Sequence, residues 1–267
     1  MTNKGKDLWK SINLHIRENK SVFILYMILR VIVVLAMVAS FINRNYENVF
    51  FCVLTLILFM IPSFIEVNFH IDLPTTLEVV ILLFIFASQI LGEMSSYYIT
   101  YPFWDTMLHT INGFLAAAIG FSLVDILNDS DKFTFQLSPI YMAVVAFCFS
   151  MTIGVLWEFF EFFMDMVFRT DMQKDTIING IYSVILDPTN SNKVVAIKNI
   201  NDVIVNGKSL GLGGYIDIGL IDTMKDLIVN FIGAVVFSII GFFYVKHRGQ
   251  GSVARRFIPK LIRQKDK

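Results

Sequence analysis

The feature that most constrains this chain is a series of six apolar segments that approach or reach the length needed to cross a lipid bilayer. They lie at about 22–42, 49–65, 76–92, 106–127, 138–163 and 226–245. Because a helix rises about 1.5 Å per residue, about 20 apolar residues cover the hydrocarbon core. Helices also satisfy their own backbone hydrogen bonds, which lipid cannot do. The sequence therefore predicts an all-α membrane protein, a six-transmembrane-helix bundle.

Composition supports the same prediction. Hydrophobic residues make up 55% of the chain and charged residues 16%, with a mean hydropathy of +0.64. Soluble domains are closer to a quarter charged. The formal net charge is zero, so no nucleic acid is expected as a partner. The expected surroundings are membrane lipids.

The two ends of the chain predict its orientation. Residues 1–21 form a basic segment, and residues 246–267 form a basic tail. Since cytoplasmic segments carry an excess of Lys and Arg, both termini are expected in the cytoplasm, in a multi-pass plasma-membrane protein. The first apolar run is longer than the core of a signal peptide, so we interpret it as a retained helix. Within it, Arg30 either extends toward the inner surface or pairs with Glu66 or Glu78.

The long connection before the sixth helix has a different pattern from the first five spans. Residues 22–163 hold those spans, residues 164–225 are mixed in character, and residues 226–245 form the last span. Short β-type runs at 194–197 and 203–205 precede the turn signal Asn206-Gly207. We expect a small extracytoplasmic α/β cap with a hairpin, and we hypothesise that it covers a pocket.

Polar residues gather where the last four spans meet the non-cytoplasmic surface. Several are spaced three or four apart, so they share a helix face. Ionisable groups within spans are costly and usually face the bundle interior. The pattern predicts one polar pocket, with these members: Glu93, Asp105, His109, Glu158, Glu161, Asp165, Asp222, Asp226 and Asn230.

Three interpretations of this set compete. Carboxylates with an imidazole suit a divalent metal such as zinc, manganese or iron, and an oxygen-rich set suits magnesium or calcium. The candidate ligands are Asp105, His109, Glu158, Glu161 and Asp226. Alternatively, the set carries out acid–base catalysis through His109, Glu158 and Asp226. Asn230, Asp222, Glu93 and Asp165 would then support the pocket. The third interpretation is structural, because an acid such as Asp105 or Asp222 also favours the start of a helix.

Three short motifs resemble a known family. Asp105-x3-His109-x3-Gly113, Glu158-x2-Glu161 and Asp226-x3-Asn230-x2-Gly233 are similar to the signature of VanZ-like bacterial membrane proteins. Trp157-Glu158 and the segment Asp171-Met172-Gln173-x-Asp175 are closer to the related YjdF-like (DUF2238) proteins. The resemblance covers about residues 93–241. It implies a bacterial plasma-membrane protein and no defined reaction.

The leading functional prediction is a membrane protein that binds or modifies a lipid or envelope-linked molecule. If it is an enzyme, the simplest chemistry is metal-assisted or acid–base hydrolysis of an ester or phosphoester. One alternative is an ion- or proton-coupled transporter, although we find no internal repeat of the kind common in transporters. The other is a structural or regulatory protein whose polar cluster locks the bundle.

Overall fold

Six helical segments of the protein are long and apolar enough to span a membrane. The computed structural model describes residues 20–69, 71–128, 137–247 and 253–261. Within these ranges the spans are Val22–Ile42, Tyr46–Asn68, Thr75–Met94, Trp104–Leu127, Pro139–Phe168 and Leu220–Lys246. The predicted six-helix architecture is confirmed. Most of the basic N-terminal segment 1–21, together with parts of the basic tail 246–267, lies outside the described residues.

The second and third spans are not continuous α-helices. The first span is α2 (Lys20–Ile42), and the second comprises α3 (Tyr46–Leu58) and α4 (Ile61–Phe69). Pro62 lies in the first turn of α4, where its missing N–H costs no helical hydrogen bond. The third span begins as α5 (Thr75–Phe86) and continues as the π-helix η1 (Ala87–Met94). The short α6 (Tyr97–Thr100) follows it.

The last three spans are single helices. They are α7 (Trp104–Asn128), α8 (Pro139–Phe168) and α9 (Leu220–Lys246). Both α8 and α9 extend further toward the connection between them than hydropathy alone predicts. Residues 164–168 and 220–225 contain neither Gly nor Pro, so their acids lower the hydropathy without ending the helix.

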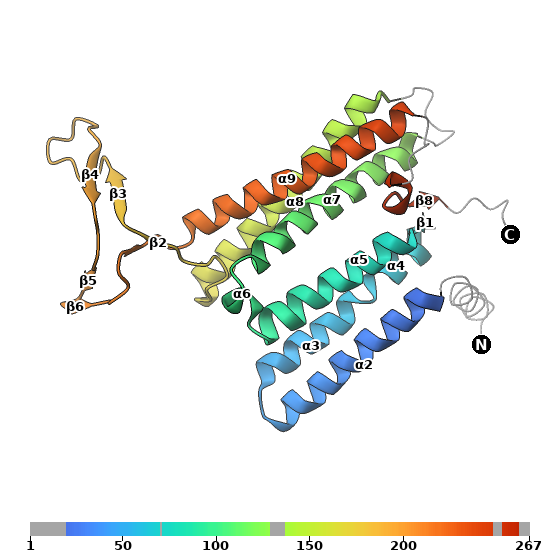
Figure 1. Cartoon of the computed structure of the whole chain (residues 1–267), viewed down its shortest axis with the longest axis horizontal. Helices are drawn as coiled ribbons and strands as arrows, with labels where there is room; N and C mark the ends of the chain where they lie inside the picture. Colours follow the sequence, from blue (N-terminus) through green and yellow to red (C-terminus); the bar gives the residue numbers. More distant parts are fainter. Residues whose placement is uncertain (1–19, 70, 129–136, 248–252, 262–267) are drawn as a thin grey trace. The chain divides into compact units, whose positions relative to one another are not determined.

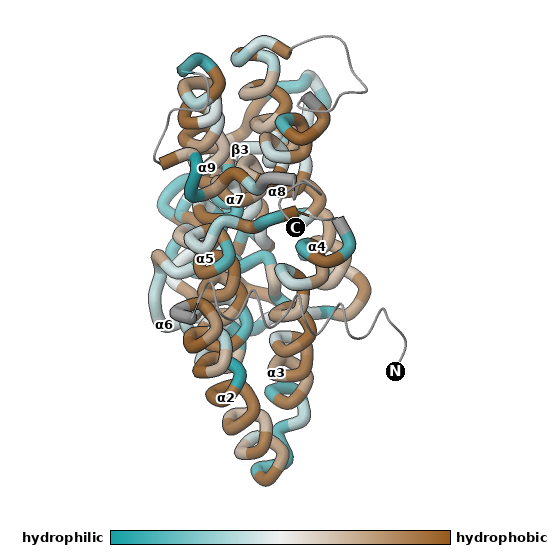
Figure 2. The backbone as a smooth tube through the Cα atoms, turned by 90° about the vertical axis from the view of Figure 1, so that its right-hand side faces the viewer, coloured by the Kyte–Doolittle hydropathy of each residue, from teal (hydrophilic) through white to brown (hydrophobic). Residues whose placement is uncertain are grey.

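The chain divides into two compact units, and α8 and α9 each contribute to both. Unit 1 comprises Met1–Thr152 and Val229–Lys267, and unit 2 is Ile153–Ile228. In unit 1, α2 packs along α3, and α5 follows, as Figure 1 shows. Their buried core includes Val33, Cys52, Phe59 and Leu82. Figure 2 shows that hydrophobic residues dominate these helices.

A second core in unit 1 joins α7, the first part of α8, the last part of α9 and the C-terminal segment. Phe121, Met142, Phe237 and Ile258 are completely buried in it. The 3-10 helix η2 (Ala254–Arg256) leads to β8 (Lys260–Leu261), which pairs antiparallel with β1 (Ile71–Asp72). The four spans between β1 and β8 return the chain to the same membrane surface, as this pairing requires.

In unit 2, the segment between α8 and α9, residues 169–219, is named the arm. It is built from three antiparallel pairs: β2 (Ile177–Ile178) with β7 (Tyr215–Ile216), β3 (Gly180–Ser183) with β4 (Val195–Lys198), and β5 (Ile204–Val205) with β6 (Lys208–Ser209). Asn206 and Gly207 have φ values of 51° and 78°, so the predicted turn is present. The helical part of the expected α/β cap lies in the extended ends of α8 and α9.

Candidate functional site

The first turns of α7 carry the imidazole and carboxylate that the sequence singled out in unit 1. Asp105 and His109 are one turn apart, with 3.5 Å between His109 Nε2 and Asp105 Oδ1. The side chains are 10% exposed for His109 and 27% exposed for Asp105. A carboxylate beside a buried imidazole orients the ring. The same two groups can also share a cation.

One turn further along α7 from this pair, a network of amide hydrogen bonds joins three helices of unit 1. Asn112 Nδ2 of α7 donates to Asn230 Oδ1 of α9 over 3.3 Å. Asn230 Nδ2 lies 3.4 Å from the Ser150 carbonyl oxygen of α8. Ser150 Oγ in turn donates to the Gly113 carbonyl over 2.7 Å. Asn230 is only 1% exposed, so its amide is matched to fixed partners within the bundle.

Two glycines bring α7 and α9 into backbone contact at this level. A Cβ atom on Gly113 would overlap the Asn230 carbonyl, and one on Gly233 would overlap the Thr110 carbonyl. These two glycines therefore permit a close contact between the helices. The fourth and sixth spans run in the same direction, because one span separates them. The contact at Gly113 and Asn230 therefore fixes which turns of α7 and α9 are level with each other.

Unit 2 contains the remaining buried acids of the predicted set. Glu158 is 4% exposed, Glu161 8% and Asp226 3%. Trp157 Nε1 donates to Glu161 Oε1 over 2.9 Å, so this carboxylate is bonded to its own helix. Burial of carboxylates at this depth is costly unless charge or hydrogen bonds compensate. Glu158 and Asp226 thus meet the burial expected of functional groups.

Asp165 and Asp222 fasten the first residues of the arm to the helix ends. Asp165 accepts hydrogen bonds from the backbone N–H groups of Met172 and Gln173, at 2.7 and 2.8 Å. Asp222 accepts from the Lys174 N–H at 2.7 Å. Their roles as supports of a pocket remain predictions. In unit 2, the hydrogen bonds of Asp165 and Asp222 anchor the arm.

Asp217 completes this anchorage from the other end of the arm. It accepts hydrogen bonds from the backbone N–H groups of Thr176, Gly219 and Ile221, at 2.7, 3.3 and 2.9 Å. Burial raises the pKa of Asp217, but these three donors outweigh burial and hold the pKa below its usual value. Sequence reasoning missed Asp217, although its position just before the helix start is a capping signal.

Two other residues lie near the start of α7 in unit 1. Glu93, the remaining predicted support, is exposed near the end of η1. Trp104 is the first residue of α7, and its ring packs edge-on against Tyr97 at a centroid distance of 4.9 Å. Its indole nitrogen is buried and has no acceptor among the described residues. A donor in that state ordinarily bonds water or a ligand oxygen.

Arg30 extends toward the N-terminal end of its helix, as one of its two interpretations predicts. Its guanidinium donates to Tyr26 Oη over 3.0 Å, one turn earlier in α2. The guanidinium carbon also lies 4.1 Å from the centre of the Tyr26 ring. This contact combines a hydrogen bond with a cation–π interaction, which lowers the cost of a charge inside a span.

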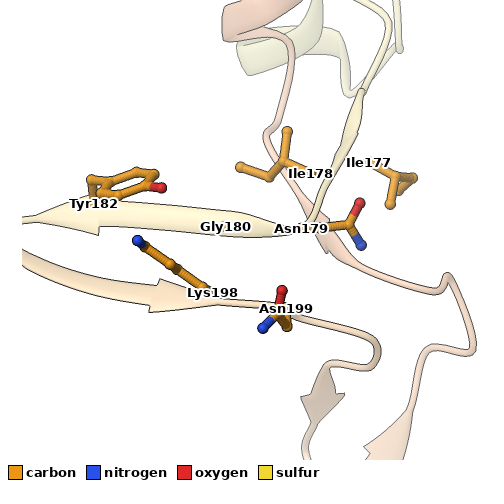
Figure 3. Close-up of a pocket in the computed structure, with 7 residues that line it drawn as sticks. All are labelled: Ile177, Ile178, Asn179, Gly180, Tyr182, Lys198 and Asn199. Carbon is orange, nitrogen blue, oxygen red and sulfur yellow. The ribbon is translucent and has the colours of Figure 1, made fainter.

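An open pocket lies on the arm, in unit 2. Its lining consists of Ile177, Ile178, Asn179, Gly180, Tyr182, Lys198 and Asn199, as Figure 3 shows. None of the nine predicted pocket residues contributes to it. From the sequence, these lining residues are expected only as part of the cap.

Comparison with known proteins places the chain in a family. The family model described as "Predicted membrane protein (DUF2238)" matches residues 25–247. No similar protein was found among curated proteins or among solved structures. The match confirms the YjdF-like (DUF2238) part of the resemblance, while likeness to VanZ rests on the three short motifs alone. Since the family model covers most of the chain, including all of α3 to α9, this protein belongs to the DUF2238 family of predicted membrane proteins.

Proposed function

We propose that this multi-pass membrane protein holds a divalent cation at the non-cytoplasmic ends of its helices and uses it on a lipid or envelope-linked substrate. The observation that carries the proposal is the Asp105–His109 pair, with 3.5 Å between imidazole nitrogen and carboxylate oxygen. One nitrogen and one oxygen ligand on successive turns of a helix suit zinc, manganese or iron.

The sequence of α9 offers a candidate for the third ligand of the proposed site. Gly113 of α7 is level with Asn230 of α9, and the two spans run in the same direction. One turn earlier in each helix stand His109 and Asp226. We propose Asp226, four residues before Asn230 in α9, as the third ligand. Glu158 and Glu161 of α8 remain candidates for a further ligand or for a general base.

The proposed chemistry is hydrolysis of an ester or phosphoester at the membrane surface. A divalent cation lowers the pKa of a bound water and polarises the substrate oxygen. The chain's own residues would hold the cation, orient His109 and accept the proton released by the water. The buried amide network would keep α7, α8 and α9 in register beneath the site. The proposal also places both termini in the cytoplasm and the arm outside.

Metal content of the purified protein tests this proposal. The full chain is purified in detergent, equilibrated with zinc, manganese or iron, desalted, and analysed by mass spectrometry of the elements. We expect close to one metal per chain in the wild type. His109→Ala and Asp226→Asn should each lower occupancy at least tenfold, because each removes a ligand.

The matched control is His247→Ala, which removes an exposed imidazole near the end of α9. This variant should retain wild-type occupancy. Metal that is absent from the wild type, or unchanged in the folded His109→Ala variant, would contradict the proposal. The second outcome would favour a structural role for the cluster.

A further inference from the structure

The open pocket on the arm is a feature that the proposed metal site does not use. The arm has no apolar core of its own, because its only buried residues are Asp187, Gly214 and Gly219. Two-stranded pairs of this kind are marginal in stability and gain little from packing. An open pocket in such a segment therefore does not arise from imperfect packing of a core.

The pocket exists because a glycine stands opposite a lysine in the β3–β4 pair. Gly180 is the register partner of Lys198, and Tyr182 is the partner of Ala196. Since side chains alternate along a strand, these four positions share one face of the pair. Gly180 contributes no side chain, so the space between Tyr182 and Lys198 stays open. Figure 3 shows the Lys198 ammonium group reaching toward this space and the Tyr182 ring lying beside it.

The charges around the pocket favour an anion. Lys198 is exposed, and no carboxylate of the described chain lies within 4.0 Å of its ammonium group. No Asp or Glu is among the seven lining residues. The side chain of Asn179 donates to the carbonyls of Ile200 and Gly213, at 2.7 and 3.0 Å, and is thereby fixed in place. The remaining lining combines a 65%-exposed tyrosine ring with isoleucine side chains.

The position of the arm indicates where such an anion would come from. The arm begins directly after Phe168 of α8 and ends directly before Leu220 of α9, and both side chains are exposed apolar groups at the ends of spans. Asp165, Asp217 and Asp222 fasten its base to those helix ends. The base of the arm is therefore anchored at the ends of two spans.

We propose that the Tyr182–Lys198 pocket binds a phosphate-bearing headgroup, with the phosphate on Lys198 and the adjoining glycerol or sugar on the Tyr182 ring. A lysine ammonium binds phosphate as a point charge, and a charge-assisted hydrogen bond is among the stronger polar contacts. The same chemistry occurs in an anionic membrane lipid and in a soluble glycerol or sugar phosphate. The proposal does not depend on Asp105 or His109.

The test is a titration of the full-length protein in detergent with phosphatidylglycerol, followed by native mass spectrometry. We expect saturable retention of one lipid. Lys198→Gln should weaken that binding about tenfold or more, which is the effect of losing one charge-assisted hydrogen bond. Lys193→Gln, which removes another exposed lysine of the arm, is the matched control and should bind as the wild type does.

Gly180→Ala tests the cavity without removing charge. Its Cβ would meet the Ile197 carbonyl at 3.4 Å and the Tyr182 ring at 3.8 Å, which are ordinary contacts, so the arm should fold. The added methyl group occupies the pocket and should weaken binding, while circular dichroism and thermal stability stay unchanged. Retention that is identical in Lys198→Gln, Gly180→Ala and wild type would overturn the proposal.

A competition experiment distinguishes the two sources of phosphate. If glycerol 3-phosphate displaces the retained lipid in the wild type, and does so more weakly in Lys198→Gln, the pocket recognises the phosphate group itself. If only the lipid binds, and binding still depends on Lys198, the occupant is a lipid headgroup. If neither probe binds in a Lys198-dependent manner, no such site exists.

Discussion

Asn230 is a polar side chain in the middle of an apolar span, and its surroundings explain how the bundle tolerates it. Its amide is bonded to Asn112 and lies near the Ser150 carbonyl, while its own backbone carbonyl faces Gly113. The sequence marked Asn230 as a supporting residue but did not identify Asn112. Asn112 lies three residues after His109, and only the packing of α7 on α9 reveals its partner.

Replacing Asn230 with leucine should destabilise the protein by about 1–2 kcal/mol, because it leaves the half-buried Asn112 amide without its acceptor. The measurement is thermal unfolding of the purified protein in detergent, with Asn43→Leu as an exposed control. An unchanged unfolding temperature for Asn230→Leu would show that the amide network contributes nothing to stability.

Hydrogen-bond partners separate anchoring acids from candidate ligands. Asp165, Asp217 and Asp222 all accept backbone N–H groups of the arm or of the start of α9. In the sequence these acids look no different from Asp105 or Asp226. An acid accepts backbone N–H groups only if the chain that follows the helix passes close to it. Helical spacing does not predict that path.

Asp217 predicts a pH dependence for the arm. Its pKa is lowered in the folded protein, so its stabilising effect is present above the pKa of an unfolded aspartate, about 3.9, and is lost as pH falls through the lower folded value. Asp217→Asn should lose the charge-assisted part of these bonds at every pH.

Hydrogen exchange of the peptides around Thr176 and Ile221, corrected for intrinsic rates, measures this effect. The wild type should be better protected than Asp217→Asn at neutral pH, and the difference should shrink as pH falls below about 4. A difference that is constant down to pH 2 would contradict the assigned role of the carboxylate.

At the scale of elements, the contact between α7 and α9 depends on glycine. A Gly→Ala change within a helix normally favours helix formation by about 1 kcal/mol. Gly233→Ala should instead lower stability, because its Cβ would overlap the Thr110 carbonyl and force the two helices apart. If the proposed metal site depends on this register, metal occupancy should fall as well.

Thermal unfolding and metal analysis of Gly233→Ala check both effects. A variant with higher stability than the wild type would show that the helices do not approach as closely as the structure indicates. Lower stability with full metal occupancy would separate the helix contact from the site.

Strand pairing in the arm shows what local sequence can and cannot predict. The hairpin at Asn206-Gly207 was predicted, because both residues adopt positive φ readily. The partner of residues 195–198 was not predicted. It is β3, which precedes it by a long loop, and the register is set by contacts distant in sequence.

At the scale of the whole molecule, an even number of spans predicts that both termini lie on one side of the membrane and the arm on the other. Alkaline phosphatase fused after Gly207 should be active, and green fluorescent protein fused at the C-terminus should fluoresce. Phosphatase that is inactive after Gly207 although the fusion is stably produced would overturn the proposed orientation.

The sequence by itself determined that this protein spans a membrane six times and belongs with small multi-pass proteins. The reason is that a segment crossing lipid must be apolar over the thickness of the bilayer and must satisfy its own backbone hydrogen bonds. The lipid therefore determines which segments are helices before the helices pack together. It also placed the rare polar groups near one surface, since their positions along each span follow from helical rise.

Only the tertiary structure decided which of those groups meet. The hydrogen bond between the Asn112 and Asn230 amides, the glycine contacts between α7 and α9, and the acids that anchor the arm all depend on which helix packs beside which. In lipid, apolar surfaces of different helices are nearly equivalent, so hydropathy does not select neighbours. Neighbouring helices are selected by close backbone approach and by matched hydrogen bonds. These are properties of helix pairs that no single segment specifies.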